Sequence, residues 1–406
     1  MRTKTTHIID SEKFKIKYYI LFTMYSAPII DLINGYFGKL LPIGQIVRVL
    51  LIFVNVYLCV KCMSIEKKKG NYLFFGIIGY VLLQSLIVGL VSKNGNFMIN
   101  INFSMKLILF LSEMQLLINY IGLEIIKKDD FTKFFKFSCW FVPLSLAACK
   151  SLNLNTVTTI SKAGLYSSTN AMSIIFIIQF VLSFYFSREE KKYYLTTLLS
   201  VIGVSLLGGK SPYVYIIFIM FTLVLFDSKH RIGKIIVFII VATLTYYILS
   251  KYFTSTMLEY VSYHTTHLKH NIETNTVWDY IFSGRNNYLK AEWKDFSSGG
   301  FIAVSLKLLF GIGRINFATV EMDIFEILFA FGIFVTIGVY YLVTQSLSWN
   351  CKQKIDNLYL NLALICMISF SILGGHTFLE AIAATYSAIL IGYKYSCYFE
   401  GEKNVE

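Results

Sequence analysis

Two arginines near the C-terminal third are the residues best suited to bind an anionic ligand. Arg285 follows Ser283-Gly284, and Arg314 ends the stretch Gly311-Ile312-Gly313-Arg314. The planar guanidinium binds phosphate oxygens through a fork of N–H donors. Aromatic faces pack against the apolar faces of sugar rings. Four such residues flank Arg285 in the chain: Trp278, Tyr280, Tyr288 and Trp293. Aromatic faces pack in the same way on other amphipathic ligands, so this combination is compatible with a sugar but does not single one out.

Groups able to transfer a proton follow these arginines. Glu321 and Asp323 precede an apolar run, where the dipole of a helix N-terminus favours an anion. Their alternative role is ordinary helix capping at a membrane boundary. His376 lies in a short turn between two apolar runs and is a candidate acid or base. A neutral, hydrogen-bonded histidine at the boundary is the alternative.

Three further cations occupy unusual positions. Lys210 lies in Gly208-Gly209-Lys210-Ser211-Pro212, which lacks the first glycine of a phosphate-binding loop because residue 204 is Val204. Lys210 can contact a lipid phosphate or can mark the membrane boundary. Arg48 and Lys106 lie inside apolar runs, where a charge must pair, snorkel or line a wet cavity. Structural pairing and contact with an anionic ligand both remain open for Arg48, and snorkelling is expected for Lys106.

Neither histidine nor cysteine spacing predicts a metal or another cofactor. His264, His267 and His270 would fan across a helix without a carboxylate or cysteine to complete a ligand set. Cys59 and Cys62 form an isolated CxxC pair at the end of an apolar run. We expect no metal, no cofactor and no disulfide framework.

The elements that carry these residues are predicted to be membrane helices. Of the 406 residues, 56% are hydrophobic and 15% are charged, and the mean hydropathy is +0.61. A soluble domain has about 25% charged residues. Apolar runs near the length of about 20 residues that a spanning helix needs recur along the chain. We predict an all-α polytopic membrane protein with twelve spans, near 18–34, 43–60, 72–91, 102–122, 137–151, 169–187, 194–208, 211–227, 235–252, 323–346, 358–374 and 381–397.

The basic residues predict the orientation. Lys and Arg concentrate in the loops that are cytoplasmic if both termini are cytoplasmic. The short loops on the other side hold only Lys39, Lys93, Lys150, Lys162 and Lys210. The net charge of +13 is therefore explained by the positive-inside rule, and nucleic-acid binding is not expected.

One long segment divides the helices into two groups. We predict nine membrane helices in residues 1–252, an extracytoplasmic loop over 253–322 and three membrane helices in 323–406. The loop is too short for a large core of its own, so it should pack on the bundle through loops and short helices. The apolar stretch Phe301 to Phe310 is expected at the membrane interface.

These features together resemble the O-antigen and capsular polysaccharide polymerases, in the superfamily of the O-antigen ligases, whose architecture is GT-C-like. The resemblance covers most of the chain as topology. In sequence it rests on four stretches: Gly164 to Asn170, Leu206 to Tyr215, Ser283-Gly284-Arg285 with Trp293, and Gly311 to Gly332. The last reads GIGRINFATVEMDIFEILFAFG and is the most specific.

The resemblance implies a reaction at the outer face of the bacterial cytoplasmic membrane. An undecaprenyl-diphosphate-linked glycan would be transferred to the non-reducing end of another lipid-linked repeat unit. Lys210 and Arg285 match basic positions that read the diphosphate in the ligase branch. Arg314 and Arg48 are further candidates for that contact, and Trp278, Tyr288 and Trp293 for contact with the glycan. The partners implied are the lipid-linked oligosaccharide, membrane lipid and a chain-length regulator protein.

One departure separates the chain from the ligases. Glu321 stands where the ligase branch has a histidine, which favours a polymerase. The general base stays open between Glu321, Asp323 and His376. A ligase is the nearest enzymatic alternative, and a flippase or transporter for the same lipid-linked glycans is the alternative from another class.

Overall fold

The computed structural model is all-helical in the part of the chain that it describes. It describes residues 2–37, 43–63, 69–91, 97–154, 163–166, 168–207, 211–227, 285–314 and 319–403, with isolated positions between 229 and 243. These residues form fourteen helices. Apart from these isolated positions, the predicted span 235–252 lies outside the described residues, and so does the predicted loop before Arg285.

The helices of the first group are α1 (Arg2–Phe37), α2 (Ile43–Met63), α3 (Lys69–Val91), α4 (Phe97–Gly122), α5 (Lys128–Ser151), α6 (Thr169–Ser187), α7 (Tyr193–Leu207) and α8 (Ser211–Phe226). Six of them, α2, α3, α4, α6, α7 and α8, follow the predicted apolar runs to within a few residues, whereas α1 and α5 begin well before the predicted spans 18–34 and 137–151 because their first turns carry polar and charged residues. The start of α6 is fixed by a side-chain cap, since Ser168 accepts a hydrogen bond of 3.0 Å from the backbone N–H of Ala171.

The second group contains two short helices followed by four longer or broken ones. Their bounds are α11 (Arg285–Phe296), α12 (Phe301–Phe310), α13 (Asp323–Phe331), α14 (Ile333–Ser348), α15 (Lys354–Leu373) and α16 (Ala381–Lys403). The short helices expected in the long segment are therefore present as α11 and α12. Side chains of α12 are strongly exposed, with Phe301 at 87% and Ile302 at 74%, as expected for a helix at an apolar interface.

Among the described residues, six helices are long and apolar enough to cross a membrane by length and composition. They lie within α1, α2, α3, α4, α6 and α15. Four shorter apolar helices, α7, α8, α12 and α14, accompany them. The chain is thus an all-α protein with several candidate membrane spans, as its hydropathy predicts.

The predicted single span 323–346 is wrong in detail, because the helix breaks at Gly332. This glycine has φ +82° and ψ 178°, a region open almost only to glycine. A Cβ there would lie 2.1 Å from the carbonyl oxygen of Leu309. The freed carbonyls of Phe329 and Ala330 accept hydrogen bonds from Ile312 and Gly313, at 2.7 and 3.1 Å. The break therefore fastens the end of α12 to the end of α13.

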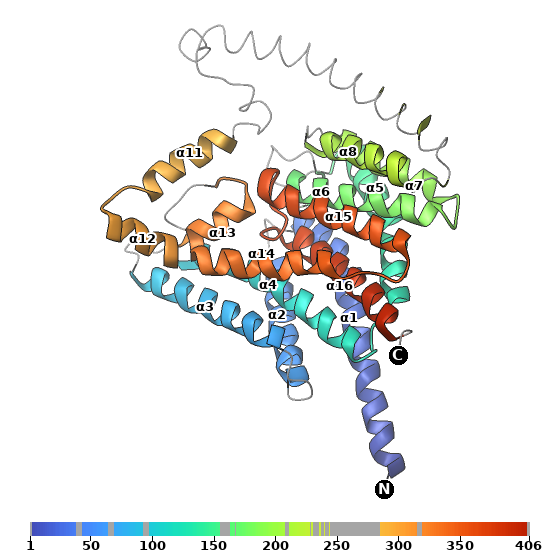
Figure 1. Ribbon diagram of the computed structural model, residues 1–406, viewed down its shortest axis with the longest axis horizontal. Coiled ribbons are helices and arrows are strands. Elements are labelled where there is room, and N and C mark those ends of the chain that lie inside the picture. Colours follow the sequence, from blue (N-terminus) through green and yellow to red (C-terminus); the bar gives the residue numbers. More distant parts are fainter. Residues whose placement is uncertain are drawn as a thin grey trace.

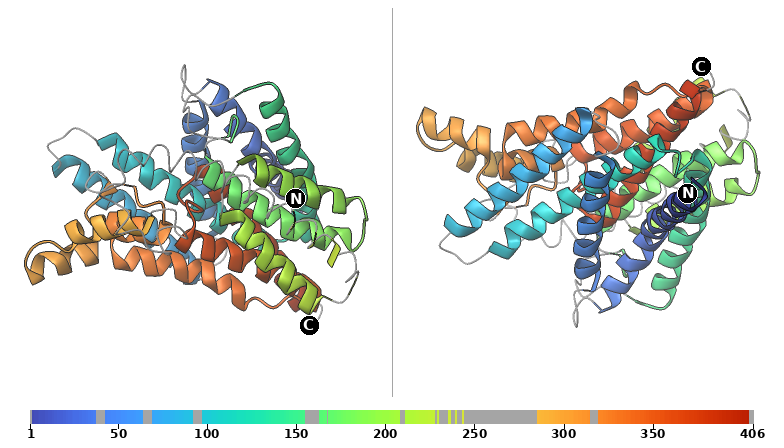
Figure 2. Two further views of the ribbon diagram at one scale, coloured as in Figure 1. Left: turned by 90° about the horizontal axis from the view of Figure 1, so that it is seen from above. Right: turned by 90° about the horizontal axis from the view of Figure 1, so that it is seen from below.

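The interior of the bundle is built mainly from α4, α6, α15 and α16 (Figure 1). Nearly all of α6 is buried. Helices α4 and α16 approach closely at Gly392, where an added Cβ would meet Leu117 and Phe131 at 3.1 Å. The views from above and below show α11 and α12 beside α13 at one extremity, away from α7 and α8 (Figure 2).

The bundle has two chemically different ends. One, the basic end, holds the connections after α6, after α8 and before α15, where ion pairs such as Lys128–Asp356 at 2.6 Å join separate helices. The other, the site end, holds the start of α6, the turn 374–380 between α15 and α16, and the start of α13. The candidate residues Arg285, Glu321 and His376 all lie at the site end.

Candidate functional site

Arg285, Glu321 and Asn170 form one hydrogen-bonded triangle at the site end. The Nη2 and Nε atoms of Arg285 donate to Oε2 of Glu321 at 3.0 and 3.2 Å. Nδ2 of Asn170 donates to the same oxygen at 3.2 Å, and its Oδ1 accepts from Arg285 at 3.4 Å. The side chain of Arg285 is 10% exposed, whereas that of Glu321 is 45% exposed. A carboxylate that reaches solvent thus occupies the fork of a nearly buried guanidinium.

The backbone at Glu321 is held in an unusual conformation. Its φ is +59°, which residues other than glycine rarely adopt. Oε1 of the buried Glu326 accepts hydrogen bonds from the backbone N–H groups of Val320 and Glu321, at 2.8 and 2.9 Å. Glu326 therefore folds the segment before α13 so that Glu321 points toward Arg285, the first residue of α11.

Asp323 and His376 form a second pair next to this triangle. Oδ2 of Asp323 accepts from the backbone N–H groups of Thr377 and Phe378, both at 2.7 Å. Its Oδ1 lies 3.2 Å from Nδ1 of His376. Asp323 is fully buried, and both of its oxygens are engaged. It therefore fixes the turn 374–380 and orients the imidazole, and it is poorly placed to remove a proton from a substrate.

The surroundings of His376 favour its charged form. Burial opposes the charge, but the hydrogen bond to Asp323 and the charge of Glu326 outweigh it and raise the pKa of His376 to about 9. Nε2 of His376 lies 3.9 Å from Oε1 of Glu326. An imidazole with this pKa carries a proton at neutral pH, so it acts as a fixed cation or an acid rather than as a base.

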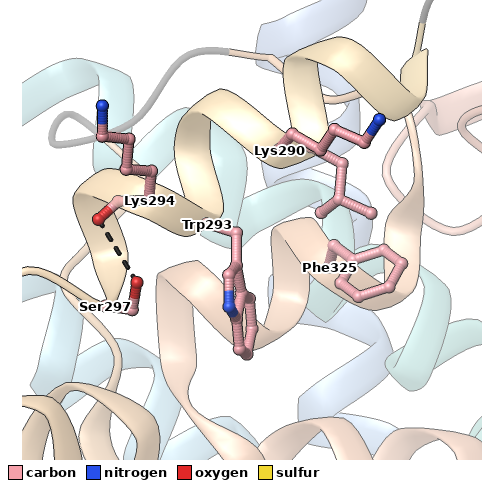
Figure 3. A pocket seen from close by; sticks show the side chains of 6 residues that line it. Lys290, Trp293, Lys294, Ser297 and Phe325 are labelled. Carbon is pink, nitrogen blue, oxygen red and sulfur yellow. Dashed lines mark hydrogen bonds between the residues drawn. The ribbon is translucent and has the colours of Figure 1, made fainter.

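A groove of about 560 Å³ lies between α11 and α13, and its lining residue Leu289 is one helical turn after Arg285 on α11. In Figure 3 the ring of Trp293 points from α11 toward α13, and Phe325 reaches toward α11 from the other side. Trp293 is 44% exposed and stacks on Phe296 with ring centroids 5.9 Å apart. The groove is lined by Leu289, Lys290, Trp293, Lys294, Ser297 and Phe325. It therefore offers an aromatic platform and two cations.

The remaining predicted site residues have four different outcomes. Arg48 forms an ion pair of 2.6 Å with the buried Asp31, which is the structural pairing left open by the sequence. Arg314 donates to the hydroxyl of Thr319 and lies over the ring of Phe103. Tyr288 is 59% exposed on α11, near the groove but not among its lining residues. Lys210, Trp278 and the three histidines at 264, 267 and 270 lie outside the described residues.

Several residues of the site were missed by sequence reasoning. Asn170 and Glu326 complete the triangle and its support, and Lys290, Lys294 and Phe325 line the groove. Glu326 gave a signal, since a carboxylate within an apolar helix needs a partner. Lys290 and Lys294 are four residues apart, so the sequence also predicts that they lie on one face of a helix.

Lys106, which was expected to snorkel, pairs with Glu380 at 3.4 Å.

In the described part of the chain no group of three or more His, Cys, Asp or Glu side chains is placed to hold a metal ion. Comparisons with models of protein families and with curated proteins find no match.

Proposed function

We propose that this protein is a polysaccharide polymerase that uses a lipid-diphosphate-linked glycan as donor. The proposal rests on one observation: the guanidinium of Arg285 is hydrogen-bonded to the solvent-exposed carboxylate of Glu321. A carboxylate and a phosphate present similar pairs of oxygens to a guanidinium. Glu321 therefore stands where a diphosphate oxygen of the donor would bind.

Donor binding and proton removal are coupled in this arrangement. When the diphosphate takes the Arg285 fork, the carboxylate of Glu321 is released beside the bound donor. It then accepts the proton of the acceptor hydroxyl while that oxygen attacks the anomeric carbon of the donor. The bond from the anomeric carbon to the diphosphate oxygen breaks, and a new glycosidic bond forms. The leaving lipid diphosphate keeps the electron pair and is stabilised by Arg285.

The neighbouring residues have supporting roles. Protonated His376 adds positive potential near the leaving diphosphate, and Asp323 holds its ring in place. Glu326 positions Glu321 through the backbone. In the groove, Trp293 would pack against a sugar ring, and Lys290 and Lys294 would attract its anionic substituents. None of these steps requires a cofactor.

The topology that goes with this function is the one that the sequence predicts. Twelve spans and a GT-C-like extracytoplasmic loop would place the site end outside the bacterial cytoplasmic membrane and both termini inside it. The collection of inter-helix ion pairs at the basic end supports that orientation, since Lys and Arg favour the cytoplasmic side. A chain-length regulator protein remains a partner for this proposal. A ligase, which transfers the glycan to a different acceptor, is the alternative enzyme. It is disfavoured because Glu321 stands where the ligases have a histidine.

Product analysis tests the function directly. Purified protein in detergent is incubated with lipid-diphosphate-linked repeat units, and the products are resolved on a gel. A ladder that rises by one repeat unit is expected of a polymerase. A single product on an added non-repeat acceptor would indicate a ligase instead.

A second candidate function, transport of the same lipid-linked glycan, has one observation in its favour. The bundle interior contains the buried carboxyls of Asp31 on α1 and Glu113 on α4, and the part-buried Arg48 of α2 pairs with Asp31. Transporters commonly use such groups inside the membrane. Movement of the lipid across a vesicle bilayer, without a ladder, would favour this candidate.

A further inference from the structure

Two thiols that the proposed reaction does not use lie together at the basic end. Cys351 is in the connection between α14 and α15, and Cys397 is near the end of α16. Both are free thiols, and their side chains are hydrogen-bonded to each other. Cys351 is 8% exposed and Cys397 is 4% exposed. Two elements that are distant in the sequence therefore contribute to one buried dithiol.

Asn357 and Lys394 complete this cluster. Oδ1 of Asn357 accepts hydrogen bonds from the backbone N–H of Cys351, at 3.4 Å, and from the ammonium of Lys394. Lys394 lies three residues before Cys397, so the two side chains lie on one face of α16. Lys394 is buried, and its ammonium is also hydrogen-bonded to the side chain of Cys351. The contacts with Asn357 thus hold a cation beside the sulfur of Cys351.

The cluster favours the thiolate form of Cys351. The hydrogen bond from Cys397 lowers the pKa of Cys351 by more than burial raises it, and the charge of Lys394 lowers it further. Asp356 opposes this effect, but its carboxylate is engaged by Lys128 at 2.6 Å. The thiolate is the reactive form of cysteine, so Cys351 is the nucleophile of the pair.

Two other buried thiols provide a contrast. Cys59 donates to the carbonyl oxygen of Ser112 at 3.9 Å, and Cys139 donates to that of Gln179 at 3.8 Å. A thiol that donates to a carbonyl keeps its proton, and both side chains are fully buried. Cys59 and Cys139 are therefore internal controls of low reactivity.

We propose that Cys351 and Cys397 are a redox-active pair, in which Cys351 reacts with a peroxide and Cys397 converts the product into a disulfide. The thiolate of Cys351 attacks one oxygen of hydrogen peroxide, the O–O bond breaks, and a sulfenic acid and hydroxide form. The thiol of Cys397 then attacks the sulfenic sulfur, the S–O bond breaks, and a disulfide and water form. The two electrons that the thiols lose reduce the peroxide.

The disulfide ties the connection before α15 to α16, and a thiol reductant reverses it by exchange. The pair lies at the opposite end of the bundle from Arg285 and Glu321. It does not depend on the proposed polymerase activity.

Oxidation of the purified full-length protein tests the proposal without any substitution. The reduced protein is treated with hydrogen peroxide at neutral pH, the remaining thiols are alkylated after denaturation, and each cysteine is quantified by peptide mass spectrometry. Cys351 and Cys397 should be lost together, as one linked pair of peptides that dithiothreitol separates. The loss should be roughly 10-fold or more faster than that of Cys59 and Cys139. Equal rates for all four thiols, or oxidation of Cys351 without a link to Cys397, would overturn the proposal.

The variant Lys394→Gln tests the activating cation. Glutamine keeps a donor for Asn357 but carries no charge, so formation of the link should slow by roughly 10-fold at neutral pH. Lys394→Arg keeps the charge and should keep the wild-type rate, which provides a test if Lys394→Gln does not fold. The control is Lys136→Gln, which removes a cation that pairs with Glu190 at 2.6 Å, also at the basic end. Equal rates in Lys394→Gln and the wild-type protein would overturn the role of the lysine.

The variant Cys397→Ser separates the two steps. Cys351 should still react with peroxide, and its sulfenic acid should accumulate and be trapped by dimedone. A disulfide between Cys351 and another cysteine in this variant would contradict the assignment of Cys397 as its partner.

Discussion

Among single residues, the pair of Arg285 and Glu321 determines how a ligand reaches the site. One partner is nearly buried and the other is half-exposed, so a ligand from solvent reaches the guanidinium only by displacing the carboxylate. The two nitrogen donors on one oxygen show that the fork is oriented before substrate arrives.

The variant Arg285→Lys tests the role of the fork. A lysine keeps the charge but loses the planar pair of donors, so polymer formation should fall by roughly 100-fold. The matched control is Arg188→Lys, which alters a comparable pair with Asp227 at the basic end. Wild-type product length and rate in Arg285→Lys would remove the arginine from the reaction.

The variant Glu321→Gln tests the proton acceptor. Glutamine keeps the size of the side chain and its contact with Arg285 but cannot accept a proton, so turnover should fall by on the order of 100-fold or more. Donor binding, measured as retention of the lipid-linked donor by the purified protein, should persist. Full turnover in this variant would exclude Glu321 as the base.

The charged state of His376 predicts a pH dependence of stability. Its pKa rises from 6.5 to about 9 in the folded protein, so its contribution is complete below pH 6.5 and is lost as pH rises through 9. The free energy of unfolding should fall over that window by on the order of 2–3 kcal/mol more in the wild-type protein than in His376→Gln. Parallel pH curves for the two proteins would show that Asp323 does not stabilise the protonated form of His376.

At the scale of the element, the break between α13 and α14 places the site. The carbonyls that it frees bind the backbone after α12, and this fixes α11 and α12 beside α13. The groove between α11 and α13 follows from that attachment.

Substitution of Gly332 tests this attachment. In Gly332→Ala the strained φ and the contact with Leu309 should lower the free energy of unfolding by about 1–3 kcal/mol or force the helices apart. Gly79→Ala is the control, because this glycine lies within α3 with open space around it. Equal thermal midpoints for the two variants would mean that the break is not needed.

Sequence patterns predicted the helices well and the site only in part. The first and last residues of α6 and α12 match the predicted apolar runs, because the residues that end each run lie next to it in the sequence. The break within the predicted span 323–346 was missed. Gly332 resembles any glycine in a membrane helix, and its close contact with Leu309 cannot be read from the sequence. Arg285 and Glu321 were recognisable by residue type. The partner Asn170 was not, because it lies 115 residues from Arg285 in the chain.

For the molecule as a whole, the proposed function requires the two ends of the bundle to lie on opposite sides of the membrane. The variants Lys290→Cys at the groove and Lys192→Cys at the basic end report on this, because all seven native cysteines are buried. A membrane-impermeant maleimide should label Lys290→Cys in intact cells and Lys192→Cys only after permeabilisation. The reverse pattern would place the site in the cytoplasm and exclude the proposed substrate orientation.

The most direct test of polymerase activity is the reaction of the purified protein with lipid-diphosphate-linked repeat units, resolved on a gel. A polymerase with Arg285 as its diphosphate ligand should give a ladder that rises by one repeat unit, is lost in Arg285→Lys and persists in Arg188→Lys. The absence of a ladder from protein that moves the same lipid across a vesicle bilayer would contradict the proposed function and would make this chain a transporter.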